Sequence, residues 1–251
     1  MTALLLRLGG PLQSWGALAV RNERFTLPFP TRSGLIGMIA AAEGRGREAD
    51  PARYRPLRFE IRVDRVVEPR VDFHTVGGGR PARETVPISA GGHRPAGQGT
   101  VVTRRHYLPD SVFAVALSCE DDTLFGDIRS ALRNPRWAPY LGRRSCPPDG
   151  PLVLGEVDDG RRWLQTLLPL ARPRPRDGND VAVEFLTDTP PDDAVPHSES
   201  VPDEPVTFHP VNRAYRDRTV HRYRKHLPAS LCAGHGIDYL DAVTAALENH
   251  R

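Results

Sequence analysis

The sequence predicts an α+β protein, and two patterns carry that prediction. Residues 57–67, LRFEIRVDRVV, alternate apolar and charged side chains, which is typical of a strand with one face in water. Residues 34–44, GLIGMIAAAEG, place apolar side chains on nearly every side of a helix, so this helix is expected to be buried. With 39% hydrophobic and 26% charged residues in 251, the chain can bury a core without disulfides and is neither collagen-like nor membrane-embedded.

The remaining elements of the first part follow in order. Residues 3–8 are an apolar run of strand length ended by Gly-Gly-Pro, and a long loop is expected from there to Pro30. Residues 104–119 predict a second long strand, residues 123–134 a helix that stops before a proline, and residues 151–157 a short strand. The order β, α, β, β, α, β is that of the ferredoxin-like (RRM-like) split βαβ arrangement.

The segment between the second and third strands differs from the rest. Residues 77–99 are rich in glycine, proline and arginine, and their polarity excludes them from a core. They are expected to form a hairpin or an extended excursion with a mobile tip.

The last third forms a smaller region, residues 159–251. Residues 177–204 hold nine acidic residues and no lysine or arginine, which predicts a solvated loop, disordered in part, around one strand at 181–187. Residues 213–225 carry six basic residues and predict a strand with an arginine face over 216–225. An amphipathic helix is expected at 236–250.

Charge is divided unevenly along the chain. Residues 1–150 hold 22 basic and 15 acidic residues, whereas residues 151–251 hold 12 and 16. Only Lys225 among the 34 basic residues is a lysine. The planar guanidinium of arginine suits phosphates and stacks on bases, but genomic base composition also raises arginine content, so both explanations stay open.

The cysteines and the apolar runs indicate a cytoplasmic protein. Cys119, Cys146 and Cys232 are odd in number and form no C-x-x-C pair, so neither a disulfide framework nor a four-cysteine zinc site is expected. Arg7 interrupts the first apolar run, and the longest uncharged apolar stretch, residues 33–42, is far below the roughly 20 residues that span a bilayer. No membrane association is expected.

The start of the first helix is a candidate phosphate site. Gly34 and Gly37 lie in its first turns, where each glycine costs about 0.5–1 kcal/mol relative to alanine. Close helix packing would explain them, and so would close approach of a phosphate to the free amides. Arg32 and Ser33 at the same helix start favour the phosphate.

A second candidate lies in the sequence PYLGRRSCPP. Tyr140 can stack on a base, Gly142 lets the backbone approach a ligand, and Arg143, Arg144 and Ser145 supply two guanidinium groups and a hydroxyl. The alternative is a solvated surface turn.

The base of the 77–99 excursion repeats this chemistry with Arg104, Arg105 and Tyr107. Nearby imidazoles raise an enzymatic alternative, in which His74, His106 and Tyr107 act as general acid and base on an RNA phosphodiester. Adjacent residues of a strand point to opposite faces, which separates His106 from Tyr107. We therefore expect no catalysis.

Five segments together resemble one known family: LRLGGPLQSWG, FPTRSGLIGMI, DFHTV, RRHYLPDSVFAVAL and, most specifically, NPRWAPYLGRRSCPP. They resemble the CasD family of subunits of the type I-E CRISPR surveillance complex, Cascade, in order over residues 3–155. The resemblance implies a non-catalytic RNA-binding protein that caps the 5′ handle of crRNA. It also implies a ferredoxin-like RNA-binding domain over residues 1–158, with a protruding β-hairpin thumb at about 77–105.

The resemblance further implies partners and RNA-binding residues. The partners are the crRNA 5′ handle, the Cascade backbone subunit and the Cascade large subunit, with target DNA reached indirectly or near the thumb, and no cofactor is expected. The helix-start motif TRSG supports RNA contacts by Arg32, Ser33 and Gly34, and GRRSCP is implied to bind the handle. His74 shapes a loop or touches the RNA.

Three other interpretations remain. The first is the metal-independent endoribonuclease that processes CRISPR repeat RNA, although in the subtype that this chain resembles a separate subunit cuts the RNA. The second is a protein-interaction module that uses the hairpin. The third is a zinc site from His221, His226, Cys232 and His235, whose spacing matches no common zinc arrangement, so no metal is expected.

Overall fold

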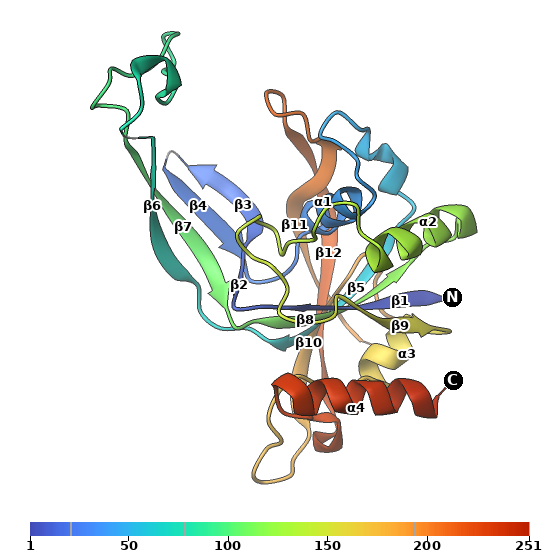
Figure 1. The fold of residues 1–251 in the computed structure, drawn as a ribbon. Helices are drawn as coiled ribbons and strands as arrows, with labels where there is room; N and C mark the ends of the chain where they lie inside the picture. The colour runs from blue at the N-terminus through green and yellow to red at the C-terminus, as the bar shows by residue number, and fades with distance from the viewer. Residues whose placement is uncertain (21, 78, 193, 251) are drawn as a thin grey trace.

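The computed structural model describes residues 1–20, 22–77, 79–192 and 194–250. Arg21, Gly78, Asp193 and Arg251 belong to the expected long loop, thumb, acidic loop and C-terminal region, and they lie outside the described residues. The fold is mixed α/β, with two curled sheets and a long hairpin that projects from the body (Figure 1).

The larger sheet has seven strands in the order β11-β12-β10-β5-β8-β1-β9, and neighbours are antiparallel. Its strands are β1 (Ala3–Gly9), β5 (Arg58–Arg65), β8 (Val112–Ser118), β9 (Val153–Val157), β10 (Val181–Thr187), β11 (His197–Thr207) and β12 (Ala214–Leu227). The strands predicted in the first eight residues, at 57–67, at 151–157 and at 181–187 are confirmed. Because β10 pairs with β5, the C-terminal strands continue the same sheet.

Helices cover both faces of this sheet. On one face, α1 (Arg32–Ala42) and α2 (Asp122–Arg133) begin at the side-chain caps Thr31 and Asp121 and pack on alternate strand residues such as Leu4 and Leu6. On the other face, α3 (Gly160–Arg162), the π-helical turn η3 (Trp163–Leu167) and α4 (Gly236–Asn249) cover Leu5 and its neighbours. The three helices predicted at 34–44, 123–134 and 236–250 are confirmed within about two residues.

The prediction that β5 has a wet face is wrong. Arg62 and Asp64 are both fully buried and form an ion pair, with 2.6 Å between Arg62 Nε and Asp64 Oδ1. The Arg62 guanidinium also donates to the carbonyl oxygens of Leu164 and Leu168, both at 2.7 Å. The segment that covers these charges lies about 100 residues further along the chain, so the alternation pattern could not show it.

The smaller sheet replaces the predicted long loop. It is built from β2 (Leu12–Gln13), β3 (Trp15–Val20), β4 (Glu23–Leu27), β6 (Arg70–Val76) and β7 (Val101–Pro109). Strands β6 and β7 are the antiparallel arms of the projecting hairpin, and the segment between them holds one short 3₁₀ turn, η2 (Ala82–Glu84).

The single strand predicted over 104–119 is two strands in two sheets. The chain leaves β7 after Pro109, and Asp110 adopts a positive φ of 44°, a conformation that Asp tolerates better than most residues. It then enters the larger sheet at Val112. Strand propensity alone does not reveal such a turn.

The acidic stretch is more ordered than predicted. Residues 197–207 form β11, which pairs with the predicted basic strand, now β12. Acidic side chains face arginines across these strands, as where Arg222 pairs with Glu184 and Glu199 at 2.9 and 3.1 Å. Cross-strand charge pairing stabilises a segment whose composition alone indicates disorder.

Within the described residues, the structure contains no helix that is long and apolar enough to span a bilayer.

Candidate nucleic-acid interface

A basic cleft of about 860 Å³ lies between two walls. Helix α1, the loop that follows it and residues 136–147 form the first wall, and the β11–β12 connection with the start of β12 forms the second. Five arginines line the cleft: Arg45, Arg47, Arg136, Arg144 and Arg213. In the part of the chain that the structure describes, no aspartate or glutamate lines it, so the cleft suits an anion of several charges.

Aromatic side chains stand beside these arginines. Trp137, Tyr140, Phe208 and Tyr215 line the same cleft, and Trp137 and Tyr215 are 47% and 39% exposed. Flat aromatic faces among guanidinium groups are the combination that single-stranded RNA uses, with stacking for the bases and ion pairs for the phosphates.

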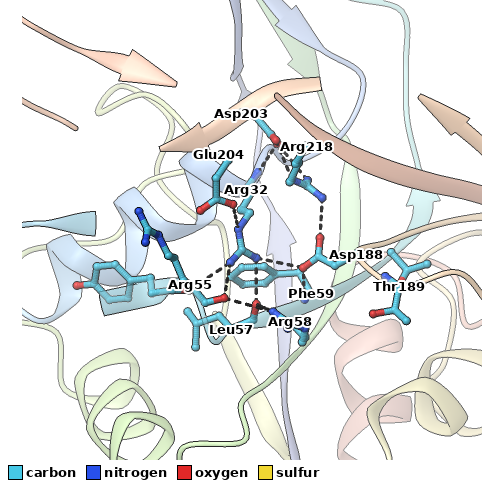
Figure 2. Close-up of polar contacts among 12 residues, drawn as sticks. Arg32, Arg55, Leu57, Arg58, Phe59, Asp188, Thr189, Asp203, Glu204 and Arg218 are labelled. Carbon is cyan, nitrogen blue, oxygen red and sulfur yellow. Dashed lines mark hydrogen bonds and ion pairs between the residues drawn. The ribbon is translucent and has the colours of Figure 1, made fainter. Parts of the chain in front are cut away.

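Arg32 does not line this cleft, so its predicted contact with a phosphate stays a prediction, and its surroundings are those of a structural residue. Its side chain is buried among acceptors from the protein: Nη1 donates to Leu57 O at 3.0 Å and Nη2 to Tyr54 O at 3.2 Å. Figure 2 shows the Arg32 guanidinium between Asp188 and Glu204. The backbone amide of Arg32 donates to Asp203 at 2.7 Å. These partners are carboxylates, which would repel a phosphate.

Gly34 and Gly37 of α1 are explained by different surroundings. A Cβ on Gly34 would lie 2.8 Å from the ring of Trp15, so this glycine is required by packing. A Cβ on Gly37 would meet nothing within 4 Å, and Gly37 lines the open cleft together with Ser33 and Gly34. Of the TRSG motif, Thr31, Ser33 and Gly34 therefore line the cleft, and Arg32 does not.

The two arginines of the GRRSC loop lie in different environments. Arg144 is exposed and lines the cleft. The Arg143 guanidinium lies 4.9 Å from the ring centroid of Tyr107 and donates to Arg24 O at 3.0 Å, so it ties the loop to β4 and β7. The expected grip of both arginines on adjacent phosphates is therefore not what the geometry offers.

The other residues of this loop also have distinct places. Tyr140 lines the cleft, and Ser145 is exposed. Gly142 has φ +81°, and a Cβ there would lie 1.8 Å from Ser14 O, so contact with the protein, rather than with a ligand, requires this glycine. Burial raises the pKa of the Cys146 thiol, which keeps it protonated at neutral pH.

The hairpin base forms a separate group outside the cleft. His74 Nε2 lies 2.7 Å from Asp72 Oδ2 and 3.3 Å from Tyr107 Oη. His106 lies elsewhere, beside Glu23 and Phe25, as expected for adjacent residues of one strand. Of the three acid-base candidates, only His74 and Tyr107 meet.

The arginines of the hairpin base have protein partners. Arg104 stacks over Phe73 at 5.4 Å and pairs with Glu23 at 3.2 Å. Arg105 Nε donates to Thr103 Oγ1 at 3.2 Å. Neither residue lines the cleft, so the two sequence-predicted basic groups do not converge on one site.

Sequence reasoning missed most of the cleft. The missed arginines and aromatic residues are Arg45, Arg47, Arg136, Trp137, Phe208, Arg213 and Tyr215. Arg136 and Trp137 stand next to the GRRSC loop, so that motif could have been extended. The contribution of residues 208–215 could not be found, because only the fold brings them to α1.

The four candidate zinc ligands do not gather. His221 Nδ1 lies 2.9 Å from Ser198 Oγ, and His235 Nδ1 lies 3.0 Å from Arg65 Nη1. Among the described residues, no group of three or more His, Cys, Asp or Glu side chains is arranged to hold a metal ion.

The chain is similar to known proteins over most of its length. Residues 3–221 match the model of the CRISPR-associated protein (Cas_Cas5) family. The chain is 36% identical over 182 residues to the CRISPR system Cascade subunit CasD of Escherichia coli (strain K12), covering 66% of this chain and 77% of that protein.

Two solved structures are similar along nearly the whole chain. One is a chain of a CRISPR RNA-guided surveillance complex, with TM-score 0.83, 42% identity and coverage of 98% and 99% of the two chains. The other is described as a crystal structure of a Cas protein, with TM-score 0.57, 27% identity and coverage of 93% and 98%.

Proposed function

Because the chain belongs to the CRISPR-associated protein (Cas_Cas5) family, we propose that it is a crRNA-binding subunit of a Cascade-type surveillance complex in antiviral defence. It is a relative of a Cascade subunit and of a chain in an RNA-guided complex. In this proposal it caps the 5′ handle of crRNA without cutting it, and it assembles with the backbone and large subunits.

One observation carries the proposal from this chain's own residues. The cleft between α1 and the β11–β12 connection presents five arginines and four aromatic side chains, with no carboxylate among its described lining residues. We assign the handle to this cleft. Ser33, Gly34, Tyr140, Gly142 and Arg144 are the sequence-predicted residues that adjoin it.

The fold is consistent with the expected division of the chain. In our proposal, the order β5-β8-β1-β9 with α1 and α2 is the ferredoxin-like core of a domain spanning residues 1–158. The β6–β7 hairpin is its thumb, which lies near the neighbouring subunit and target DNA. Residues 159–251 add three strands and α4, and they cover the sheet face on which RRM domains bind RNA.

The test of the proposal is the RNA that the native assembly carries. When the complex is purified through a tag on this chain and its RNA is sequenced, we expect short RNAs that share one constant 5′ sequence. A mock purification from cells without the tag gives the background. RNA of random sequence, or none, would count against the proposal.

We also expect the chain to leave its repeat RNA intact over hours, with or without added divalent metal. The contact between His74 and Tyr107 makes the test worthwhile, because a placed acid or base gains typically 10²–10⁴ in rate. However, Tyr107 is only 3% exposed, and burial keeps its hydroxyl from a backbone phosphate. The measurement is gel analysis of end-labelled repeat RNA. Cutting at one phosphodiester that His74→Ala abolishes would establish the nuclease alternative instead.

A further inference from the structure

Five charged side chains meet between the start of α1 and the C-terminal strands. Arg32 and Arg218 lie among Asp188, Asp203 and Glu204 (Figure 2). All five side chains are at most 16% exposed. Their charges are therefore poorly screened by solvent, and their positions depend on one another.

Two carboxylates join the two arginines. Asp188 Oδ1 lies 2.6 Å from Arg218 Nη1, and its Oδ2 lies 3.1 Å from Arg32 Nη1. Asp203 accepts from Arg218 Nε at 2.7 Å and from the Arg32 backbone amide at 2.7 Å. The cluster thus connects the first residue of α1 to the end of β10, to β11 and to β12.

The cluster lies next to the elements that form both walls of the cleft. Ser33 and Gly34, next to Arg32, belong to the first wall. Phe208 follows Glu204 by four residues, and Tyr215 precedes Arg218 by three, so β11 and β12 lead from the cluster into the second wall. A change in the cluster would therefore move one wall relative to the other.

From this geometry we infer that Arg218, with Asp188 and Asp203, is a positioning residue that sets the separation of the two cleft walls and hence the affinity for RNA. Arg218 does not line the cleft, so it acts through the residues that do. This inference rests on the proposed function for the identity of the ligand, but the separation of the walls can be measured without RNA.

Arg222 provides a matched control on the same strand. It is 27% exposed and pairs with Glu184 and Glu199, so it also has two carboxylate partners. These ion pairs stay within the three C-terminal strands and do not reach α1. Arg218→Met and Arg222→Met remove the same charge from one strand, and only the ion pairs of Arg218 reach α1. The Arg222 guanidinium also lies 5.7 Å from the ring centroid of Phe29, and methionine keeps an apolar contact available to that ring.

The first measurement is the distance between the walls. Spin labels are attached to Ala138→Cys on the first wall and to Val211→Cys on the β11–β12 connection, both at exposed positions, while the three native cysteines are buried. We expect Arg218→Met to broaden and lengthen the label-to-label distance, and Arg222→Met to leave it unchanged. An unchanged distribution in Arg218→Met would overturn the inference.

The second measurement is RNA affinity, with a single-stranded RNA oligonucleotide of the constant 5′ sequence as the probe. We expect Arg218→Met to weaken binding about tenfold or more, and Arg222→Met less than about twofold. Equal losses in the two variants would overturn the inference. If the wild-type chain did not bind this RNA, the proposed function would be overturned. The distance measurement would still decide the role of Arg218.

A conservative variant guards against loss of the fold. Asp188→Asn keeps the size of the side chain and an acceptor for the Phe59 amide, which donates to Asp188 at 3.0 Å, but it weakens both links to the arginines. We expect a smaller change in the same direction in both measurements. No change in either one would contradict the inference.

Discussion

Arg32→Ala is expected to lower the free energy of unfolding by about 3–5 kcal/mol, because it removes one partner from a buried ionic cluster. Asp188 and Asp203 would keep their negative charges beside Arg218, and Glu204 would lose the ion pair with Arg32. The carbonyl oxygens at residues 54, 55 and 57 would also each lose one of their donors. Chemical denaturation followed by circular dichroism measures this loss.

The control for this prediction is Arg144→Ala, which removes an exposed guanidinium from the wall of the cleft. Its free energy of unfolding should stay within about 0.5 kcal/mol of the wild-type value. If Arg32→Ala were as stable as Arg144→Ala and lost RNA affinity instead, Arg32 would be an RNA-binding residue after all, as the TRSG motif suggests.

The combined substitution Arg144→Ala and Arg213→Ala is expected to weaken RNA binding about 100-fold or more. Both guanidinium groups line the cleft, one from each wall, and a hydrogen bond to a charged group is worth about 1.5–3 kcal/mol. Loss of two phosphate contacts should also reduce the slope of log affinity against log salt by about 1.4 for a single strand. Titration of labelled RNA at several salt concentrations measures both quantities.

A second pair of arginines tests whether position matters beyond charge. Arg174 and Arg176 are exposed and lie outside the cleft, so replacing both with alanine removes the same charge. We expect a loss of affinity below about threefold from this control, since it changes only the general field of the protein. Similar losses from the two double variants would mean that RNA responds to net charge and not to the cleft.

The sequence predicted the elements whose signals are local. The apolar runs of β1 and β10, the alternation of β5 and the capped amphipathic helix α2 depend on neighbouring residues only, and each of them is confirmed. The hairpin of β3 and β4 was missed because its residues carry few apolar alternations, and pairing with β7 stabilises it. Long-range strand pairing of this kind cannot be detected in a short window of the sequence.

The candidate site was predicted in part for the same reason. The GRRSC loop was predicted to bind RNA, and it borders the basic cleft. The sequence could not show that Arg143 lies against Tyr107 while Arg144 lines the cleft. The TRSG motif contains Arg32, whose side chain is buried in ion pairs. The sequence could not show that carboxylates surround this arginine, since they lie more than 150 residues further along the chain.

Those long separations also have a consequence for the order in which the protein folds. The bond from the Arg32 amide to Asp203 joins residues 171 positions apart, and contacts of such high contact order form late. During synthesis the N-terminal sheet strands and α1 leave the ribosome long before β11 and β12. The cleft therefore has only its first wall until roughly the last 50 residues emerge. Under the proposed function, a nascent chain therefore presents only one wall to crRNA, and the complete binding cleft exists only in the finished protein.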